Sequence, residues 1–299
     1  MNLIAEDKQW IQNVWRDAKR WRKIPLGPIQ LTLKLSKRDA AQKRGSLGFT
    51  ARQEKIPSIP HADTPNRGPA VVVGVGPGLG EHAARLFALK GLPVVLVSRS
   101  ADALHTYADS LSSIGRRVRA IPCDVTDERA VMKLMQMVES EFGAPEVIVY
   151  AVQTSNPGSL VSTEAAAFEE CWRRNCLGAF IVAREAAKRM IVARRGTILF
   201  AGATSGTVGR KGYVNLAIGK FGLRALAQVM ARELGPDGVH VTHIVIDGNI
   251  AGSGHDDNGP QINPEELAEL LWSVHQQPRS CWTSELDVRP AEEEFWEHC

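Results

Sequence analysis

The chain has 299 residues, a length that suits either two domains or one large α/β domain. With 44% hydrophobic, 23% charged and 6% aromatic residues, its composition excludes the disordered, fibrous and small disulfide-framework classes. No apolar run reaches 18 residues, so no transmembrane helix is expected. The formal charge of +3 is unevenly divided: residues 1–69 hold 14 Lys and Arg against 6 Asp and Glu, whereas residues 70–299 hold 22 against 27. A basic N-terminal segment therefore precedes an acidic remainder.

Residues 1–69 are predicted to form a basic extension with an amphipathic helix. Apolar residues recur at helical spacing between Ile4 and Trp21, and residues 36–69 are basic and interrupted by proline and glycine. This stretch cannot build its own core, so we expect it to bind another surface. An acidic protein partner, an anionic membrane surface, RNA and the acidic remainder of the same chain all fit a basic segment.

Alternating apolar and amphipathic segments begin at Ala70. Strands are predicted at 70–75, 93–98, 117–122, 146–151, 196–202 and 239–246, with an edge strand within 283–288. Helices are predicted at 79–90, 101–114, 127–142, 164–193, 215–234 and 264–275. Nearly continuous apolar strands separated by helices indicate a parallel sheet covered on both faces. The sequence therefore predicts one doubly wound α/β domain over residues 70–299.

A glycine-rich loop follows the first predicted strand and leads into the first predicted helix. It contains Gly74, Gly76, Gly78, Leu79 and Gly80. Glycine permits a tight turn and lets backbone N–H groups approach a pyrophosphate, which the positive end of the helix also attracts. The loop therefore predicts a dinucleotide site.

The second predicted strand ends in Ser98 and Arg99. A site specific for NAD usually has an acidic residue here that binds the ribose 2′-hydroxyl, whereas a cation suits the 2′-phosphate of NADP. We therefore expect NADP(H) as the cofactor, with NADPH preferred over NADH. Alternatively, Arg99 is a solvated loop residue.

Over residues 68–290 the chain resembles the short-chain dehydrogenase/reductase family, which implies a Rossmann fold. Val73–Gly80 is similar to the family's TGxxxGxG loop, and Cys123–Asp127 resembles the segment in which an acid, here Asp124, followed by Val125, contacts the adenine. By the same resemblance, Asn175 is the structural and proton-relay asparagine, and Lys220 is the lysine of the catalytic YxxxK motif, which also holds the nicotinamide ribose.

The catalytic part of the motif set departs from the family. Leu216 occupies the position of the tyrosine that acts as the general acid, and Ala203 occupies that of the serine that polarises the substrate. Tyr213, seven residues before Lys220, is the candidate substitute acid, and Thr204 or Ser205 could polarise the substrate. The alternative is that Tyr213 packs near the pocket and that the two hydroxyls form local turn bonds.

Two functions follow from these residues. The first is an NADP(H)-binding protein with a degenerate active site that serves as an accessory or structural subunit, attached to its assembly through residues 1–69. The second is an active NADP(H)-dependent oxidoreductase on an alcohol or carbonyl substrate. Assembly into a large particle favours the first function, and a small homo-oligomer favours the second.

The cysteines bear on the compartment and on metal binding. The five cysteines, at 123, 171, 176, 281 and 299, form no CxxC pair and accompany no histidine cluster, so neither a disulfide framework nor a metal site is expected. We therefore expect a reducing intracellular compartment, either the cytoplasm or an organelle matrix such as that of the mitochondrion.

Overall fold

The computed structural model describes residues 67–112, 114, 117–254 and 259–292. The predicted amphipathic helix lies outside the described residues, as does all of the extension before Arg67. The assignment of residues 1–69 to a separate extension therefore stays a prediction.

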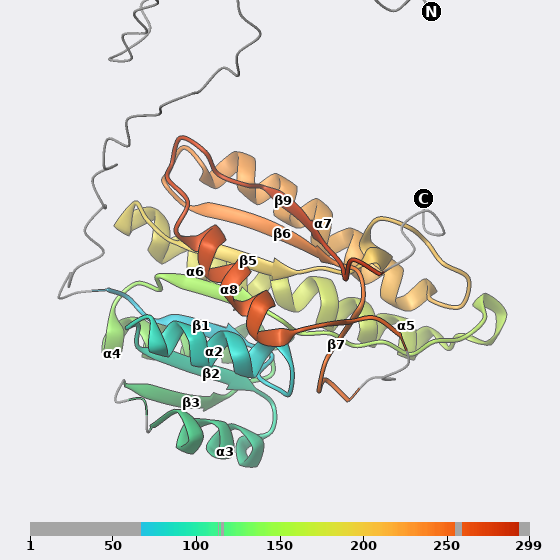
Figure 1. Ribbon diagram of the computed structural model, residues 1–299, viewed down its shortest axis with the longest axis horizontal. Coiled ribbons are helices and arrows are strands. Elements are labelled where there is room, and N and C mark those ends of the chain that lie inside the picture. The colour runs from blue at the N-terminus through green and yellow to red at the C-terminus, as the bar shows by residue number, and fades with distance from the viewer. Residues whose placement is uncertain (1–66, 113, 115–116, 255–258, 293–299) are drawn as a thin grey trace, which may run out of the picture. The chain divides into compact units, whose positions relative to one another are not determined.

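The described residues contain a seven-stranded sheet with the strand order β3-β2-β1-β4-β5-β6-β9, in which every neighbouring pair is parallel (Figure 1). The strands are β1 (Ala70–Val73), β2 (Val94–Ser98), β3 (Val118–Pro122), β4 (Val147–Tyr150), β5 (Thr197–Ala201), β6 (His240–Ile246) and β9 (Glu285–Val288). The predicted doubly wound parallel sheet is confirmed, including the edge strand within 283–288. A separate pair of two-residue strands, β7 (Asn249–Ile250) and β8 (Gln261–Ile262), was not predicted.

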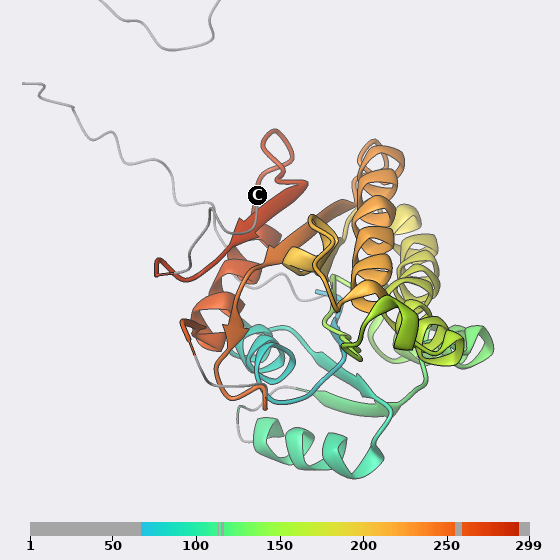
Figure 2. The same ribbon diagram turned by 90° about the vertical axis from the view of Figure 1, so that its right-hand side faces the viewer.

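Helices cover both faces of the sheet, as Figure 2 shows in the view along the strands. One face carries α2 (Leu79–Leu89), α3 (Ala101–Ser112) and α8 (Pro264–His275), and the other carries α4 (Glu128–Phe142), α6 (Gly178–Ala193) and α7 (Val214–Leu234). Two short turns, η1 (Leu160–Ser162) and η3 (Thr204–Gly206), lie in loops that follow β4 and β5.

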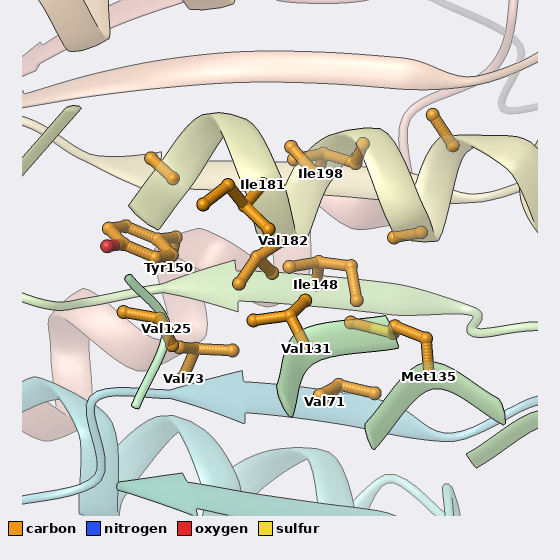
Figure 3. Close-up of a cluster of buried hydrophobic side chains, with 14 of the residues drawn as sticks. Val71, Val73, Val125, Val131, Met135, Ile148, Tyr150, Ile181, Val182 and Ile198 are labelled. Carbon is orange, nitrogen blue, oxygen red and sulfur yellow. The ribbon is translucent and has the colours of Figure 1, made fainter. Parts of the chain in front are cut away.

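Successive side chains of each strand point to opposite faces of the sheet, which produces two hydrophobic cores. On β1, Val71 and Val73 pack on the side of α4 and α6, whereas Ala70 and Val72 pack on the side of α2. Figure 3 shows the first core, in which Val71 and Val73 face side chains from β4, α4 and α6. Because both faces are buried, every residue of β1 is apolar, as expected for a parallel strand.

The predicted helix over 164–193 is divided into three parts. It consists of α5 (Ala165–Trp172), a π-helical turn η2 (Arg173–Leu177) and α6. A π turn inserts a residue into the helical repeat, and such insertions are frequent at functional sites. The residue buried in this turn is Asn175.

The connections between strands and helices place several loops together at the carboxyl ends of the strands. From β1 the chain runs outward to β2 and β3, and then returns to β4 on the other side of β1. This reversal opens a crevice at the carboxyl ends of β1 and β4, which is where doubly wound sheets bind their ligands.

Candidate functional site

A pocket of about 650 Å³ lies at this crevice. It is lined by residues that follow β1, β2, β3 and β4. They include Gly74, Gly76, Ser98, Arg99, Asp124 and Val125, all of which were predicted from the sequence, together with Tyr107, Thr154 and Arg174. The fold therefore brings together the first glycines, the residues after β2 and the Asp124 segment in one pocket.

Two of the loop glycines are required by the protein's own packing. Gly74 has a φ of 94°, and a Cβ there would lie 2.8 Å from the carbonyl carbon of Ala151. A Cβ on Gly80 would lie 2.5 Å from the carbonyl oxygen of Gly74. A side chain at either position would therefore push the loop away from β4 or from α2.

Gly76 has a different reason to be glycine. It lines the pocket, its φ is not positive, and a Cβ there would meet no protein atom within 4 Å. Space that the protein itself leaves empty beside a backbone segment is what a closely bound ligand requires.

The start of α2 follows this loop directly. Gly78 caps the helix with a φ of 89° and no side-chain hydrogen bond, and a Cβ there would lie 3.2 Å from Cβ of Ser253 and 3.3 Å from Cγ2 of Ile250. Leu79 follows and packs its side chain into the core, so only its backbone is available to a ligand. An N-terminus without a side-chain cap, beside the space at Gly76, fits the pyrophosphate of a dinucleotide.

Asp124 lines the pocket and is held in place by Thr126. Its Oδ1 accepts hydrogen bonds from the backbone N–H and the hydroxyl of Thr126, both at 2.9 Å. The hydrogen bonds from Thr126 lower the pKa of Asp124, and the positive charges of Arg174 and Arg99 add to this effect. Val125 beside it is buried. Arg174 carried no sequence signal, because only the π turn brings it to the pocket.

Asn175 shapes the loop after β4 instead of pointing into open space. Its Oδ1 accepts a hydrogen bond from the backbone N–H of Thr154 at 3.0 Å, and its Nδ2 donates to the carbonyl oxygen of Thr154 at 2.7 Å. Thr154 lines the pocket. Asn175 is therefore placed as a support for the pocket wall.

Lys220 is fully buried on α7. Its Nζ donates a hydrogen bond to the carbonyl oxygen of Ala201, at the end of β5, at 2.8 Å. Burial lowers the pKa of Lys220 to about 7 from its ordinary value of 10.5. Leu216 lies one helical turn earlier and is 6% exposed. Lys220 is not among the residues that line this first pocket or the second pocket described next.

A second pocket, of about 410 Å³, lies beyond the carboxyl ends of β5 and β6. Among the residues that line it are Ala203, Thr204, Ser205, Arg210, Tyr213 and Asp247. Tyr213 is 38% exposed and lies at the N-cap of α7, immediately before the first helical residue, Val214. The candidate substitute groups therefore share one pocket.

The hydroxyl of Thr204 is committed to an acidic side chain. It donates a hydrogen bond to Oδ1 of Asp247, a buried residue that follows β6. Arg289 holds the other oxygen of Asp247, with its Nη1 3.0 Å from Oδ2. A hydroxyl proton donated to a carboxylate cannot also be donated to a substrate oxygen, which weakens Thr204 as the polarising group.

Two general features of the described residues bear on function. They contain no group of three or more His, Cys, Asp and Glu side chains that could hold a metal ion. Among the described helices, none is long and apolar enough to cross a membrane.

Comparison with known proteins identifies the family to which this fold belongs. The family model for short chain dehydrogenases matches residues 69–255. An uncharacterized oxidoreductase of Staphylococcus aureus strain N315 is 26% identical over 224 residues, which cover 74% of this chain and 96% of that protein. The crystal structure of a short-chain dehydrogenase from Rhodopseudomonas palustris has a TM-score of 0.68 at 31% identity, covering 76% of this chain and 100% of the other.

The chain belongs to the short-chain dehydrogenase/reductase family. The fold is also shared with an alcohol dehydrogenase from the archaeon Thermococcus sibiricus, complexed with 5-hydroxy-NADP, at a TM-score of 0.71 and 22% identity over 77% of this chain and 99% of that one. The family and the fold predicted from the sequence are both confirmed.

Proposed function

We propose that this chain is an NADP(H)-binding family member that has lost the proton-donating part of its active site and acts as an accessory subunit. The observation that carries the proposal is the contrast between two regions. The nucleotide pocket keeps its glycine loop and Asp124, whereas the position one turn before the buried Lys220 holds Leu216. A leucine has no proton to donate.

The residues around the pocket would divide the cofactor between them. Gly76 and the start of α2 would hold the pyrophosphate, Asp124 the adenine, and Arg99 the 2′-phosphate. The cofactor would supply a hydride when bound, as in other members of the family. A guanidinium at Arg99 supports a preference for NADPH over NADH, because it can pair with a phosphate.

The role of Lys220 in this proposal is binding rather than catalysis. With a pKa of about 7, the Lys220 amine is protonated in about half of the molecules at pH 7. The carbonyl oxygen of Ala201, and not a tyrosine, orients this amine. Ala203 stands in place of the serine and Leu216 in place of the tyrosine, and neither side chain can donate a proton to a carbonyl oxygen.

The accessory role rests on residues 1–69. A basic segment attached to an acidic domain, and not needed for the fold that begins at Ala70, favours attachment to an acidic partner protein in a reducing compartment. Size-exclusion chromatography of the native protein from its source tests this role. Elution in a large particle supports it, and elution as a free monomer or small homo-oligomer contradicts it.

Binding and turnover of NADPH test the loss of catalysis. We expect purified protein to bind NADPH in a fluorescence titration and to oxidise it no faster than Lys220→Ala does with a panel of aldehydes and ketones. Robust turnover of any carbonyl compound that disappears in Lys220→Ala would overturn the proposal.

A second candidate is an active oxidoreductase that uses Tyr213 as its acid. The observation in its favour is that Tyr213 and Ser205 line the same pocket. This candidate requires turnover in the wild type and a loss of at least about 100-fold in Tyr213→Phe, the usual scale for a general acid. An unchanged rate in that variant would remove it.

A further inference from the structure

The nucleotide pocket contains an arginine to which the proposed function gives no role. Arg174 lies in the π turn η2, and its side chain lines the pocket together with those of Arg99 and Asp124. The side chain of Arg174 is 21% exposed, so a ligand in the pocket can contact it. Arg174 is therefore a candidate binding residue for the nucleotide.

The backbone around Arg174 is fixed by two buried side chains. Tyr150, at the end of β4 (Figure 3), donates a hydrogen bond to the carbonyl oxygen of Arg174 at 2.5 Å. Gly178 leaves room for this hydroxyl, since a Cβ there would lie 2.7 Å from its oxygen. The next residue, Asn175, binds the backbone of Thr154 through both polar atoms of its side chain. The arginine therefore borders the pocket from a well-supported part of the chain.

The charge of Arg174 is partly offset by two carboxylates. Its Nη2 pairs with Oε1 of Glu170, one turn earlier on α5. The second carboxylate is Asp124, whose pKa is lowered by the hydrogen bonds from Thr126 and also by the charge of Arg174. A guanidinium beside two carboxylates attracts a phosphate only weakly, but its N–H groups can still donate to a neutral acceptor.

We propose that Arg174 donates a hydrogen bond to a ring nitrogen of the adenine, beside the contact of Asp124 with the adenine amino group. Adenine presents ring-nitrogen acceptors next to an amino group that donates. Arginine only donates and a carboxylate only accepts, so the two side chains together match this edge of the base. Both bonds from Thr126 go to Oδ1 of Asp124, which leaves Oδ2 for the amino group. This inference rests on the proposed binding of NADP(H) and adds a residue that recognises the base.

Deaza analogues of ADP test the contact one atom at a time on the full chain. ADP carries the adenine and the pyrophosphate without the 2′-phosphate or the nicotinamide, and in its analogues N1, N3 or N7 is replaced by a C–H group. Displacement of fluorescent NADPH measures the affinities of ADP and the three analogues. One analogue is expected to bind about tenfold or more weakly than ADP, the loss for a hydrogen bond from a charged donor.

Two neighbouring variants, Arg174→Met and Arg173→Met, locate the contact. Arg173 is the matched control, because it lies in the same π turn and pairs with Glu169 at the same spacing, but it is not among the residues that line the pocket. The loss on removing the ring nitrogen should shrink to below about threefold in Arg174→Met and persist in Arg173→Met.

The outcomes separate this inference from the proposed function. If NADPH does not bind to the wild type, the proposed function fails and the inference fails with it. If NADPH binds, the inference alone is overturned when ADP does not displace it, when ADP and all three analogues bind the wild type equally, or when the loss persists in Arg174→Met. Equal weakening of ADP and every analogue in Arg174→Met would assign the arginine to a phosphate instead. The wild-type comparison stands even if Arg174→Met does not fold.

Discussion

Replacing Lys220 by methionine should stabilise the protein while weakening its binding of NADPH. Burial lowers the pKa of Lys220 to about 7, so at pH 7 the unfolded chain holds a proton on this amine that half of the folded molecules lack. At 1.36 kcal/mol per pKa unit, this difference destabilises the fold by about 4 kcal/mol. Methionine removes this cost of burying the amine, but it leaves the carbonyl oxygen of Ala201 without its hydrogen-bond donor, which costs about 1–3 kcal/mol. The expected net gain is about 1–3 kcal/mol.

The pH dependence of folding stability gives a second test of the buried amine of Lys220. Between pH 7 and 10.5 the unfolded chain binds more protons at this site than the folded protein, so the contribution of Lys220 to stability rises with pH by up to about 1.4 kcal/mol per unit. Lys220→Met should lose this part of the slope.

Urea unfolding of the wild type and of Lys220→Met at pH 7, 8 and 9 provides the measurement, and NADPH titration of both proteins accompanies it. Lys211→Met is the control, since replacing an exposed lysine should change stability by less than about 0.5 kcal/mol. A destabilised Lys220→Met with the wild-type slope would refute the reasoning, because the amine would then be a favourable, charged group.

Three further predictions concern the pocket and the core. Gly76→Val should weaken NADPH binding about tenfold or more and leave the midpoint of thermal unfolding within about 2 °C of the wild type. Gly80→Val should lower that midpoint by several degrees, because only the valine at position 80 would collide with the backbone. Equal shifts of the midpoint in the two variants would contradict this difference. Arg99→Gln should reduce affinity for NADPH but not for NADH, as measured by fluorescence, and a parallel loss for both would assign Arg99 another role. Burial lowers the pKa of His275 to about 3, so below pH 6.5 the unfolded chain binds a proton that the folded protein does not, and stability should fall with acidification. In unfolding curves measured from pH 7 to 4, the stability of His275→Gln should fall less steeply than that of the wild type. An unchanged fall would refute this prediction.

The sheet was predictable because its signal is local. Strands such as β1 and β2 are buried on both faces, so they are almost entirely apolar, and each is followed by a helix with an apolar stripe. The glycine loop was predictable for the same reason, since its role depends on backbone conformation within a few residues.

The parts that the sequence did not predict depend on contacts between distant residues. The π turn that buries Asn175 interrupts a segment whose apolar spacing is compatible with one long helix. The ion pair of Asp247 with Arg289 joins residues far apart in sequence, as does the bond from Thr204 to Asp247. Neither pairing has a motif, so the arrangement of the second pocket could be found only from the folded structure.

The most direct test of a nucleotide site without its proton donor is to restore the missing hydroxyls. NADPH oxidation is measured with the same panel of aldehydes and ketones for the wild type and for the double variant Ala203→Ser/Leu216→Tyr, each at saturating NADPH. We predict equal NADPH affinity and a rate at least about 100-fold higher in the double variant for one or more carbonyl compounds. A wild type that already oxidises NADPH as fast as the double variant would contradict the account.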